Sequence, residues 1–442
     1  LRCRSTKVEI HDFCRVFLSN FCFGNIIMTP ENLLYIILAI LTFNFLLGRI
    51  MQFLTAQSWK KAAIPEEVQG LYDDDKYEKA RQYHSEGGKV GLLRRSVAFA
   101  VTFAFLAFGW YGWLYANCLA WAGESPVGAG LLFFGILGGL SSIISLPFSL
   151  YSNFVIEAKY GFNRMTLGTF FADLGKGALL QAIIGGGLLS LLIIVFEQIG
   201  IHFWWIGWGI MALFSISMSG LYVRLFLPLF NKLTPMEDGA LKTKIEEYAK
   251  GIDFPVTKIF VMDGSKRSNK ANAFFTGLGR QKTIVLYDTL IEKFDDDELL
   301  AVLAHEVGHY KRRHIPIQMV TGVLQLGLVF GLFQLVAFGY GDLIASMLNL
   351  PVINLPVALL IFGFMYSPLQ LITGYLSSSL SRKFEYEADA FAKETSSGEA
   401  LASALRKLSV EHLSNLNPNN FVVSMTYSHP PLWQRLRALA QN

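Results

Sequence analysis

The chain has 442 residues, of which 52% are hydrophobic and 16% charged, and its formal net charge is +4 at pH 7. Its mean hydropathy of +0.40 is too high for a soluble enzyme of this length, so the composition excludes an ordinary soluble protein and indicates a polytopic membrane protein. A small net charge gives no reason to expect a nucleic-acid partner. We expect the lipid bilayer to be the main partner of the chain.

The first 27 residues differ from the apolar pattern that follows them. Three of the four cysteines lie there, and Met28 stands directly before the first apolar run. The basic residues of this segment would lie on the outer side of the membrane, against the usual charge rule. We therefore expect residues 1–27 to be a non-native or disordered extension. Because the remaining cysteine, Cys118, lies near a span end, we expect neither a disulfide nor a cysteine metal site.

Seven apolar stretches are long enough to cross the hydrocarbon core as helices. They run approximately Leu33–Leu54, Ser96–Leu119, Val127–Tyr151, Ala178–Phe196, Phe203–Phe226, Ile315–Tyr340 and Ile353–Leu380. Pro356 and Pro368 are expected to kink the last of them.

Lysine and arginine are absent from residues 96–158, 177–223 and 314–381, each of which contains two spans and the loop between them. Because positive residues of short loops stay on the cytoplasmic side, the other loops and the C-terminal tail are expected there. The end that precedes the first span is then expected outside.

The segment between the fifth and sixth spans has the pattern of a small soluble unit. A strand-like run, Lys258–Asp263, is followed by two apolar runs, Ala271–Thr276 and Thr283–Tyr287, with glycines between them, which predicts a hairpin. An edge strand of this kind can bind an extended peptide through its main chain. Asp295 and Glu298 then predict a capping box at the start of a helix.

That helix carries the sequence HEVGH at 305–309. His305 and His309 are four residues apart and project from one helical face, so both imidazoles can reach a single Zn²⁺. Glu306 then lies beside the metal, where a carboxylate can take the proton of an activated water. A solvated amphipathic helix has the same spacing, but a chance match is rare in a chain with eight histidines.

A catalytic zinc site needs three protein ligands and one open position. The best candidate for the third ligand is in the sequence SRKFEYEADA at 381–390, where Glu385 and Asp389 share a helical face. We expect Glu385 to bind the metal and Asp389 to hold a metal-ligating imidazole, while Glu387 points elsewhere. Without the upstream motif this segment would be interpreted as an ordinary charged helix.

From about residue 31 to residue 439, the chain resembles the integral-membrane CAAX prenyl proteases, seven-span zinc metallopeptidases related to the gluzincins. The matching segments are Ile64–Val68, Glu157–Asn163, Ser265–Ser268, Asn272–Gly277, His305–His309, Ser381–Asp389 and His429–Pro431 with Arg435. The resemblance implies a predominantly α-helical fold with seven transmembrane helices around a water-filled chamber, and a gluzincin-like metalloprotease domain with a small β-hairpin.

The same resemblance implies roles for the site residues. His305, His309 and Glu385 are the implied ligands of one Zn²⁺ per chain, and Glu306 is the implied general base. Asn272 is implied on the strand that holds the peptide. His429 and Arg435 are implied to face the scissile carbonyl and to stabilise its oxyanion. Two other interpretations stay open, namely that Asn272 is a turn residue and that His429 only begins a helix before Pro430 and Pro431.

These observations divide the chain into five parts. Residues 1–27 are the extension, residues 28–226 hold five spans, residues 227–314 form the soluble segment with the zinc motif, residues 315–380 hold two spans, and residues 381–442 form the C-terminal segment. We expect the motif, Glu385 and the tail to meet on the cytoplasmic side.

The function predicted is a zinc endopeptidase that removes the C-terminal tripeptide of prenylated proteins and acts as a monomer on a peptide or protein substrate. Short outer loops suggest a prokaryotic plasma membrane, and a cell without prenylation would instead use the enzyme for membrane protein quality control. A third hypothesis is a transporter or scaffold with structural zinc. Structural sites have four ligands and are commonly rich in cysteine, which makes this hypothesis the weakest.

Overall fold

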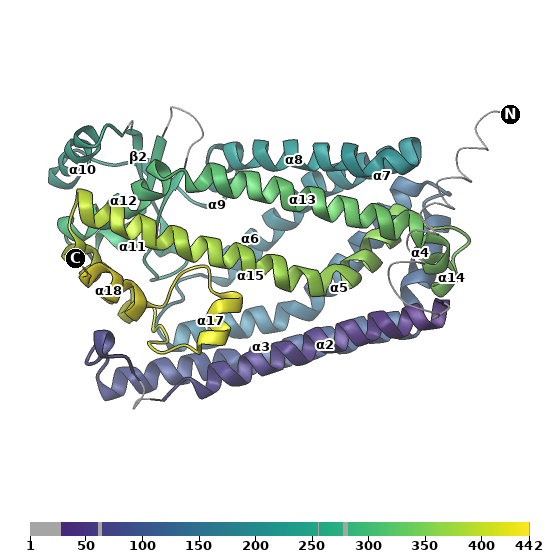
Figure 1. Cartoon of the computed structure of the whole chain (residues 1–442), viewed down its shortest axis with the longest axis horizontal. Helices are drawn as coiled ribbons and strands as arrows, with labels where there is room; N and C mark the ends of the chain where they lie inside the picture. The colour runs from purple at the N-terminus through teal and green to yellow at the C-terminus, as the bar shows by residue number, and fades with distance from the viewer. Residues whose placement is uncertain (1–27, 61–63, 255, 277–281, 442) are drawn as a thin grey trace.

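The computed structural model describes residues 28–60, 64–254, 256–276 and 282–441. The expected N-terminal extension, residues 1–27, and the loop of the expected hairpin, residues 277–281, lie outside the described residues. A long helical bundle carries a small sheet and several short helices at one end, while α4 (Trp110–Trp121) and α14 (Gly341–Met347) lie at the other end (Figure 1).

Six helical stretches in the described part of the chain are long and apolar enough to cross a membrane. Their elements are α2 (Pro30–Gln57), α3 (Asp74–Ala107), α5 (Pro126–Tyr151), α6 (Leu167–Leu180), α7 (Gly186–Ile199), α8 (Phe203–Leu221), α9 (Leu227–Phe230), α13 (His314–Gly339) and α15 (Leu355–Thr395). The predicted first, third, sixth and seventh spans correspond to α2, α5, α13 and α15.

The predicted fourth and fifth spans lie in one helical stretch, residues 167–230. This stretch turns at Gly200, whose φ of 52° favours glycine, and α8 then runs against α7. The predicted second span, Ser96–Leu119, was wrong as a single helix. The chain leaves helical geometry at Gly109, where φ is 68°, so α3 ends at Ala107 and α4 begins at Trp110.

The helix α15 extends well beyond the predicted span end at Leu380 and continues to Thr395. Pro356 lies in its first turn, where proline fits a helix, so the kink predicted at Pro356 is absent. Pro368 lies in the interior and cannot donate to the carbonyl of Phe364. The Ser367 hydroxyl donates to that carbonyl at 2.7 Å, which satisfies it inside the apolar helix.

The sheet has four strands in the order β1-β2-β4-β3. They are β1 (Leu233–Pro235), β2 (Val256–Met262), β3 (Ala273–Thr276) and β4 (Lys282–Tyr287). The antiparallel pairing of β3 with β4 confirms the predicted hairpin and leaves β3 at the edge, while β2 and β4 are parallel.

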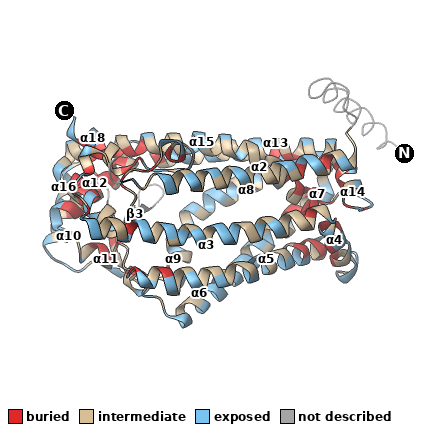
Figure 2. Ribbon diagram, turned by 90° about the horizontal axis from the view of Figure 1, so that it is seen from below, coloured by how far each residue is buried: buried red, intermediate tan, exposed pale blue. Residues whose placement is uncertain are grey.

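The remaining helices are α10 (Ala240–Gly251), α11 (Asp288–Ile291), α12 (Asp296–Lys311), α16 (Gly398–Glu411), α17 (Asn420–Thr426) and α18 (Leu432–Ala440). They lie at the sheet end of the bundle, apart from α17, which packs against α15 and α2 (Figure 1). Buried residues gather toward the two ends of the bundle, whereas the middle parts of the long helices are mainly exposed or intermediate (Figure 2). The most tightly packed parts of the molecule are therefore its ends.

Candidate metal centre and active site

The helix α12 starts with the predicted capping box. The Asp295 side chain accepts from the backbone N–H groups of Asp297 and Glu298, and the Glu298 carboxylate accepts from the Asp295 N–H at 3.2 Å. Glu298 is buried and also accepts from Ser403 and Lys407 of α16. The start of the motif helix is thus fixed both to its own backbone and to α16.

Gly308 brings the motif helix against α15. A Cβ at this position would lie 3.0 Å from the Ala388 Cα and 3.1 Å from the Ala388 carbonyl oxygen. Such contacts are tighter than ordinary Cβ contacts, so glycine at this position lets the two backbones approach without displacing either of them. The approach places the face of α12 that carries both motif histidines opposite the face of α15 that carries Glu385.

His305, His309 and Glu385 form a compact donor cluster. The two Nε2 atoms are 3.2 Å apart, His305 Nε2 is 3.5 Å from Glu385 Oε2, and His309 Nε2 is 3.3 Å from Glu385 Oε1. Ligand bonds of 2.0–2.1 Å in a tetrahedral zinc site require donors about 3.3 Å apart. These are also the only three His, Cys, Asp or Glu residues that meet in such a cluster within the described ranges.

The carboxylate of Glu385 supports the same interpretation. Its Oε2 atom is buried and has no hydrogen-bond partner among the described residues. A buried carboxylate oxygen without a hydrogen bond is costly, and a bound cation would satisfy it together with the Arg435 guanidinium, whose Nη1 lies 3.5 Å away. The donor set and its spacing therefore fit a tetrahedral divalent metal ion with one open position.

Asp389 supports His305 from the side away from the cluster. Its Oδ1 is 2.8 Å from His305 Nδ1, and both residues are buried. Burial lowers the pKa of His305, but the neighbouring carboxylates of Asp389 and Glu385 outweigh this effect and raise the pKa to about 9. A carboxylate in this position fixes the ring and makes its Nε2 a stronger ligand.

Arg435 binds Asp389 rather than facing open space. Its Nε and Nη2 atoms donate to the two oxygens of Asp389 at 2.8 and 2.6 Å, and Nη1 lies 3.5 Å from Glu385 Oε2. Two of the three guanidinium nitrogens are therefore bound to a carboxylate. The third nitrogen, Nη1, is the one that lies beside Glu385 and the donor cluster.

His309 has a support that the sequence analysis missed. Its Nδ1 is 3.0 Å from Nδ1 of His314, and His314 Nε2 is 2.9 Å from Oε2 of Glu387. Glu387 is not one of the three donors, but His314 connects it to His309. His309 and His314 are five residues apart, and such a pair does not share a face of a continuous helix. The sequence spacing therefore does not predict their contact.

Glu306 and His429 lie beside the donor cluster. Burial raises the pKa of the partly buried Glu306 carboxyl, which also interacts electrostatically with both motif histidines. His429 lies in the loop before α18, with Nε2 3.4 Å from Glu385 Oε1. The cap residue of α18 is Pro431, so His429 does not cap that helix.

Asn272 is exposed and lies directly before the edge strand β3, which runs beside α12. Its side-chain oxygen accepts from the Ala273 N–H at 2.9 Å, and its carbonyl accepts from the Tyr287 N–H at 3.1 Å. Asn272 thus marks the first residue of the hairpin edge that neighbours the motif helix.

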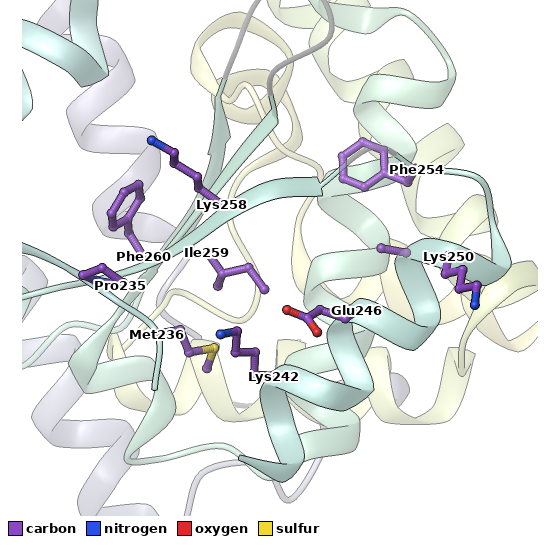
Figure 3. A pocket seen from close by; sticks show the side chains of 10 residues that line it. Pro235, Met236, Lys242, Glu246, Lys250, Phe254, Lys258, Ile259 and Phe260 are labelled. Carbon is purple, nitrogen blue, oxygen red and sulfur yellow. The ribbon is translucent and has the colours of Figure 1, made fainter. Parts of the chain in front are cut away.

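Two pockets border this part of the molecule. One, of about 740 Å³, lies between α10 and β2, where Lys242 and Glu246 line it (Figure 3). It contains none of the donor residues. The other, of about 620 Å³, runs between α13 and α15 and reaches Ser428, next to His429. None of the three donor residues lines the second pocket either.

The fold and the donor cluster together define a class, the metallopeptidases embedded in membranes. Two family descriptions match the chain: "CAAX prenyl protease N-terminal, five membrane helices" over residues 52–232 and "Peptidase family M48" over residues 235–442.

Named relatives match over most of their length. The chain is 36% identical to CAAX prenyl protease 1 homolog of Oryza sativa, covering 86% of this chain and 91% of that protein. It is 33% identical to CAAX prenyl protease 1 of Saccharomyces cerevisiae, covering 88% and 91%. The crystal structure of S. mikatae Ste24p superposes with a TM-score of 0.86 at 32% identity, covering 92% of this chain and 99% of that one.

The chain therefore belongs to peptidase family M48, among the relatives that carry the CAAX prenyl protease name. It is a multi-pass membrane metalloendopeptidase, as the sequence predicted, and the family uses a metal cofactor. The hypothesis of a transporter or scaffold finds no support in these matches.

Proposed function

We propose that this protein is a zinc endopeptidase that removes the C-terminal tripeptide from prenylated proteins. The observation that carries the proposal is the tetrahedral spacing of His305, His309 and Glu385 beside Glu306. The relatives named CAAX prenyl protease 1, at 33–36% identity over most of the chain, support the choice of substrate.

Zinc is the proposed metal, because two imidazoles and a carboxylate are the donor set of gluzincin-type catalytic sites. His305, His309 and Glu385 would hold it. When bound, zinc would polarise the scissile carbonyl and lower the pKa of water at the open position. The bond from Asp389 to His305 keeps the Nε2 atom of that ring directed at the metal.

Glu306 is the proposed general base. It takes a proton from the attacking water and passes it to the leaving amine. Burial raises the pKa of its carboxyl and so brings it closer to the working pH, which favours proton transfer in both directions. Its position on the same helical turn as His305 keeps the carboxylate beside the donor cluster.

His429 is the proposed donor to the oxyanion. Its side chain is exposed, and its Nε2 lies 3.4 Å from a carboxylate oxygen of Glu385. A donor placed there stabilises negative charge that develops only during the reaction. Arg435 is assigned a positioning role instead, because its bidentate contact with Asp389 fixes the residue that orients His305.

We propose that the substrate peptide adds to the edge of β3, with Asn272 at one end of the bound segment. Edge strands bind extended peptides through unpaired main-chain groups. The contact of β3 with α12 would bring such a peptide next to Glu306.

We also propose that the spans enclose a chamber, that the site faces the cytoplasm and that the enzyme acts as a monomer. The low burial of the spans, 6–33% of each apolar window, suits helices that enclose a space. The distribution of lysine and arginine supports a cytoplasmic site. A prokaryotic plasma membrane stays a prediction from the short outer loops, and the relatives named above are eukaryotic.

A comparison of two peptides tests the proposal. The purified enzyme is given a farnesylated CAAX peptide and the same peptide without the lipid, with Glu306→Gln as the inactive control. We expect release of the tripeptide and a higher kcat/KM for the farnesylated peptide. Equal cleavage of an unmodified, unfolded peptide at internal bonds would instead support membrane protein quality control.

A further inference from the structure

A chain of three contacts leads from the surface of α15 to the donor cluster. Glu387 Oε2 lies 2.9 Å from His314 Nε2, and His314 Nδ1 lies 3.0 Å from His309 Nδ1. The remaining ring nitrogen of His309 is the one that faces His305 and Glu385. Each ring nitrogen of His309 and His314 thus lies next to a polar atom of another residue.

The proton positions along this chain follow from the proposed metal site, on which this inference rests. His309 Nε2 must keep its lone pair for the metal, so the proton of that ring is on Nδ1. This N–H needs an acceptor, and His314 Nδ1 is the neighbour in reach. His314 then carries its proton on Nε2 and donates it to Glu387, which as a carboxylate can only accept.

The position of His314 is fixed by the fold around it. Its side chain is 1% exposed, and the ring stacks on Phe384 with centroids 4.1 Å apart and planes at 11°. It is the first residue of α13 and follows Arg313, whose φ of 60° turns the chain out of α12. A residue other than glycine seldom adopts this left-handed backbone conformation, which costs conformational energy. The fold retains it, and the resulting turn places His314 next to His309.

We propose that His314 and Glu387 are positioning residues for the metal site, and that they hold His309 in the tautomer and orientation that bind the metal. The hydrogen-bonded partner of a ligating histidine commonly changes metal affinity or activity by about 10–100-fold when it is removed. A purely structural role would make His314 a packed core residue and Glu387 a surface residue beside Lys383, which lies 3.7 Å away.

Two pairs of variants separate these roles. His314→Leu and Glu387→Ala remove the hydrogen bonds. His314→Asn and Glu387→Gln each retain an acceptor oxygen near the position of the original atom. The control is Glu394→Ala, because Glu394 lies on the same helix and pairs with Arg312 at 3.8 Å, outside the contact chain.

Zinc affinity is measured on the full chain in detergent by competition with a chelator, and the melting temperature is measured with the chelator in excess. We expect Glu387→Ala and His314→Leu to bind zinc about 10–100-fold more weakly. His314→Asn and Glu387→Gln should lose less zinc affinity, and Glu394→Ala should bind zinc as tightly as the wild type. Glu387 is partly exposed, so Glu387→Ala tests the proposal even if His314→Leu does not fold.

Two results would overturn the inference. One is unchanged zinc affinity in Glu387→Ala, and the other is a lower melting temperature of His314→Leu without any loss of affinity. Glu385→Ala, measured in the same series, separates this inference from the proposed function. If Glu385→Ala still binds zinc as the wild type does, the proposed metal site is wrong. If it loses zinc while Glu387→Ala binds normally, only the positioning role is wrong.

Discussion

The two halves of α15 are stabilised in different ways. The membrane half is buried only in its first turns, Leu355 to Phe362, and no residue from Gly363 to Leu380 is buried. In this less buried stretch the Asn44 Nδ2 atom donates to Ser367 Oγ at 2.6 Å. From Phe384 to Ala392 the same helix packs closely on α12, and Glu385 and Asp389 are both buried. One helix thus combines a sparsely buried middle, Gly363 to Leu380, with a closely packed end that carries the ligands.

This difference suggests where the protein tolerates change. A catalytic site must hold its groups within fractions of an ångström, and buried paired charges provide that rigidity only while every partner is present. Spans that enclose a substrate or face lipid need length and apolarity but little fixed packing. The predictions below compare substitutions in the two halves, in order of decreasing effect.

Asp389→Leu should have the largest effect on stability. It leaves the buried Arg435 without its bidentate partner, and loss of one member of a buried ion pair costs about 3–5 kcal/mol. Thermal unfolding with excess chelator measures this loss. The double variant Asp389→Leu with Arg435→Met should recover most of the stability but not the zinc affinity. If the double variant is no more stable than Asp389→Leu alone, the unpaired Arg435 is not the cause of the lost stability.

His429→Ala should lower kcat by roughly 10²–10³-fold with little change in KM, because the lost contact is made chiefly in the transition state. Zinc content and melting temperature should stay at wild-type values, since His429 caps no helix and its side chain is 63% exposed. All three quantities are measured on one preparation. A drop in melting temperature with normal turnover would show that His429 is only structural.

Gly308→Ala should destabilise the protein by about 1–3 kcal/mol, the usual cost of overpacking, because the new methyl group meets the backbone of Ala388. Gly363→Ala is the matched control in the membrane half of α15, where a Cβ meets nothing within 4 Å. Unfolding midpoints of the two variants should differ clearly. Equal midpoints would contradict the close approach of α12 and α15.

Ser367→Ala should have the smallest effect. Hydrogen bonds between membrane helices contribute about 0.6 kcal/mol on average, and the variant loses the one with Asn44 together with the local bond to the Phe364 carbonyl. Peptidase activity should not change, and the melting temperature should fall slightly. A large loss of activity would show that the membrane half of α15 takes part in catalysis more directly than the comparison of the two halves implies.

Much of the fold followed from local patterns in the sequence. Apolar runs located most of the spans, two short apolar runs with glycines between them located the β3–β4 hairpin, and Asp295 with Glu298 predicted the capping box. Each of these signals lies within a few residues of the element that it predicts. The break at Gly109 was missed because the flanking residues are apolar on both sides, and the three-residue strand β1 was missed because it is too short to show a period.

The site was predictable to the extent that helical spacing brings side chains together. His305 with His309, and Glu385 with Asp389, are four residues apart, and the structure brings these two pairs together as expected. The role of His314 depends on a left-handed turn at Arg313, and the direction of Arg435 depends on how α18 packs against α15. Such tertiary contacts leave no periodic signal in the sequence.

The most direct test of the central claim is Glu306→Gln, with zinc content and cleavage of the farnesylated peptide measured on the same preparation. The amide cannot accept a proton from water, whereas His305, His309 and Glu385 are unchanged. We predict one zinc ion per chain and a loss of kcat of roughly 10²–10⁴-fold, the usual contribution of a general base. Wild-type turnover by the zinc-loaded variant would contradict the account.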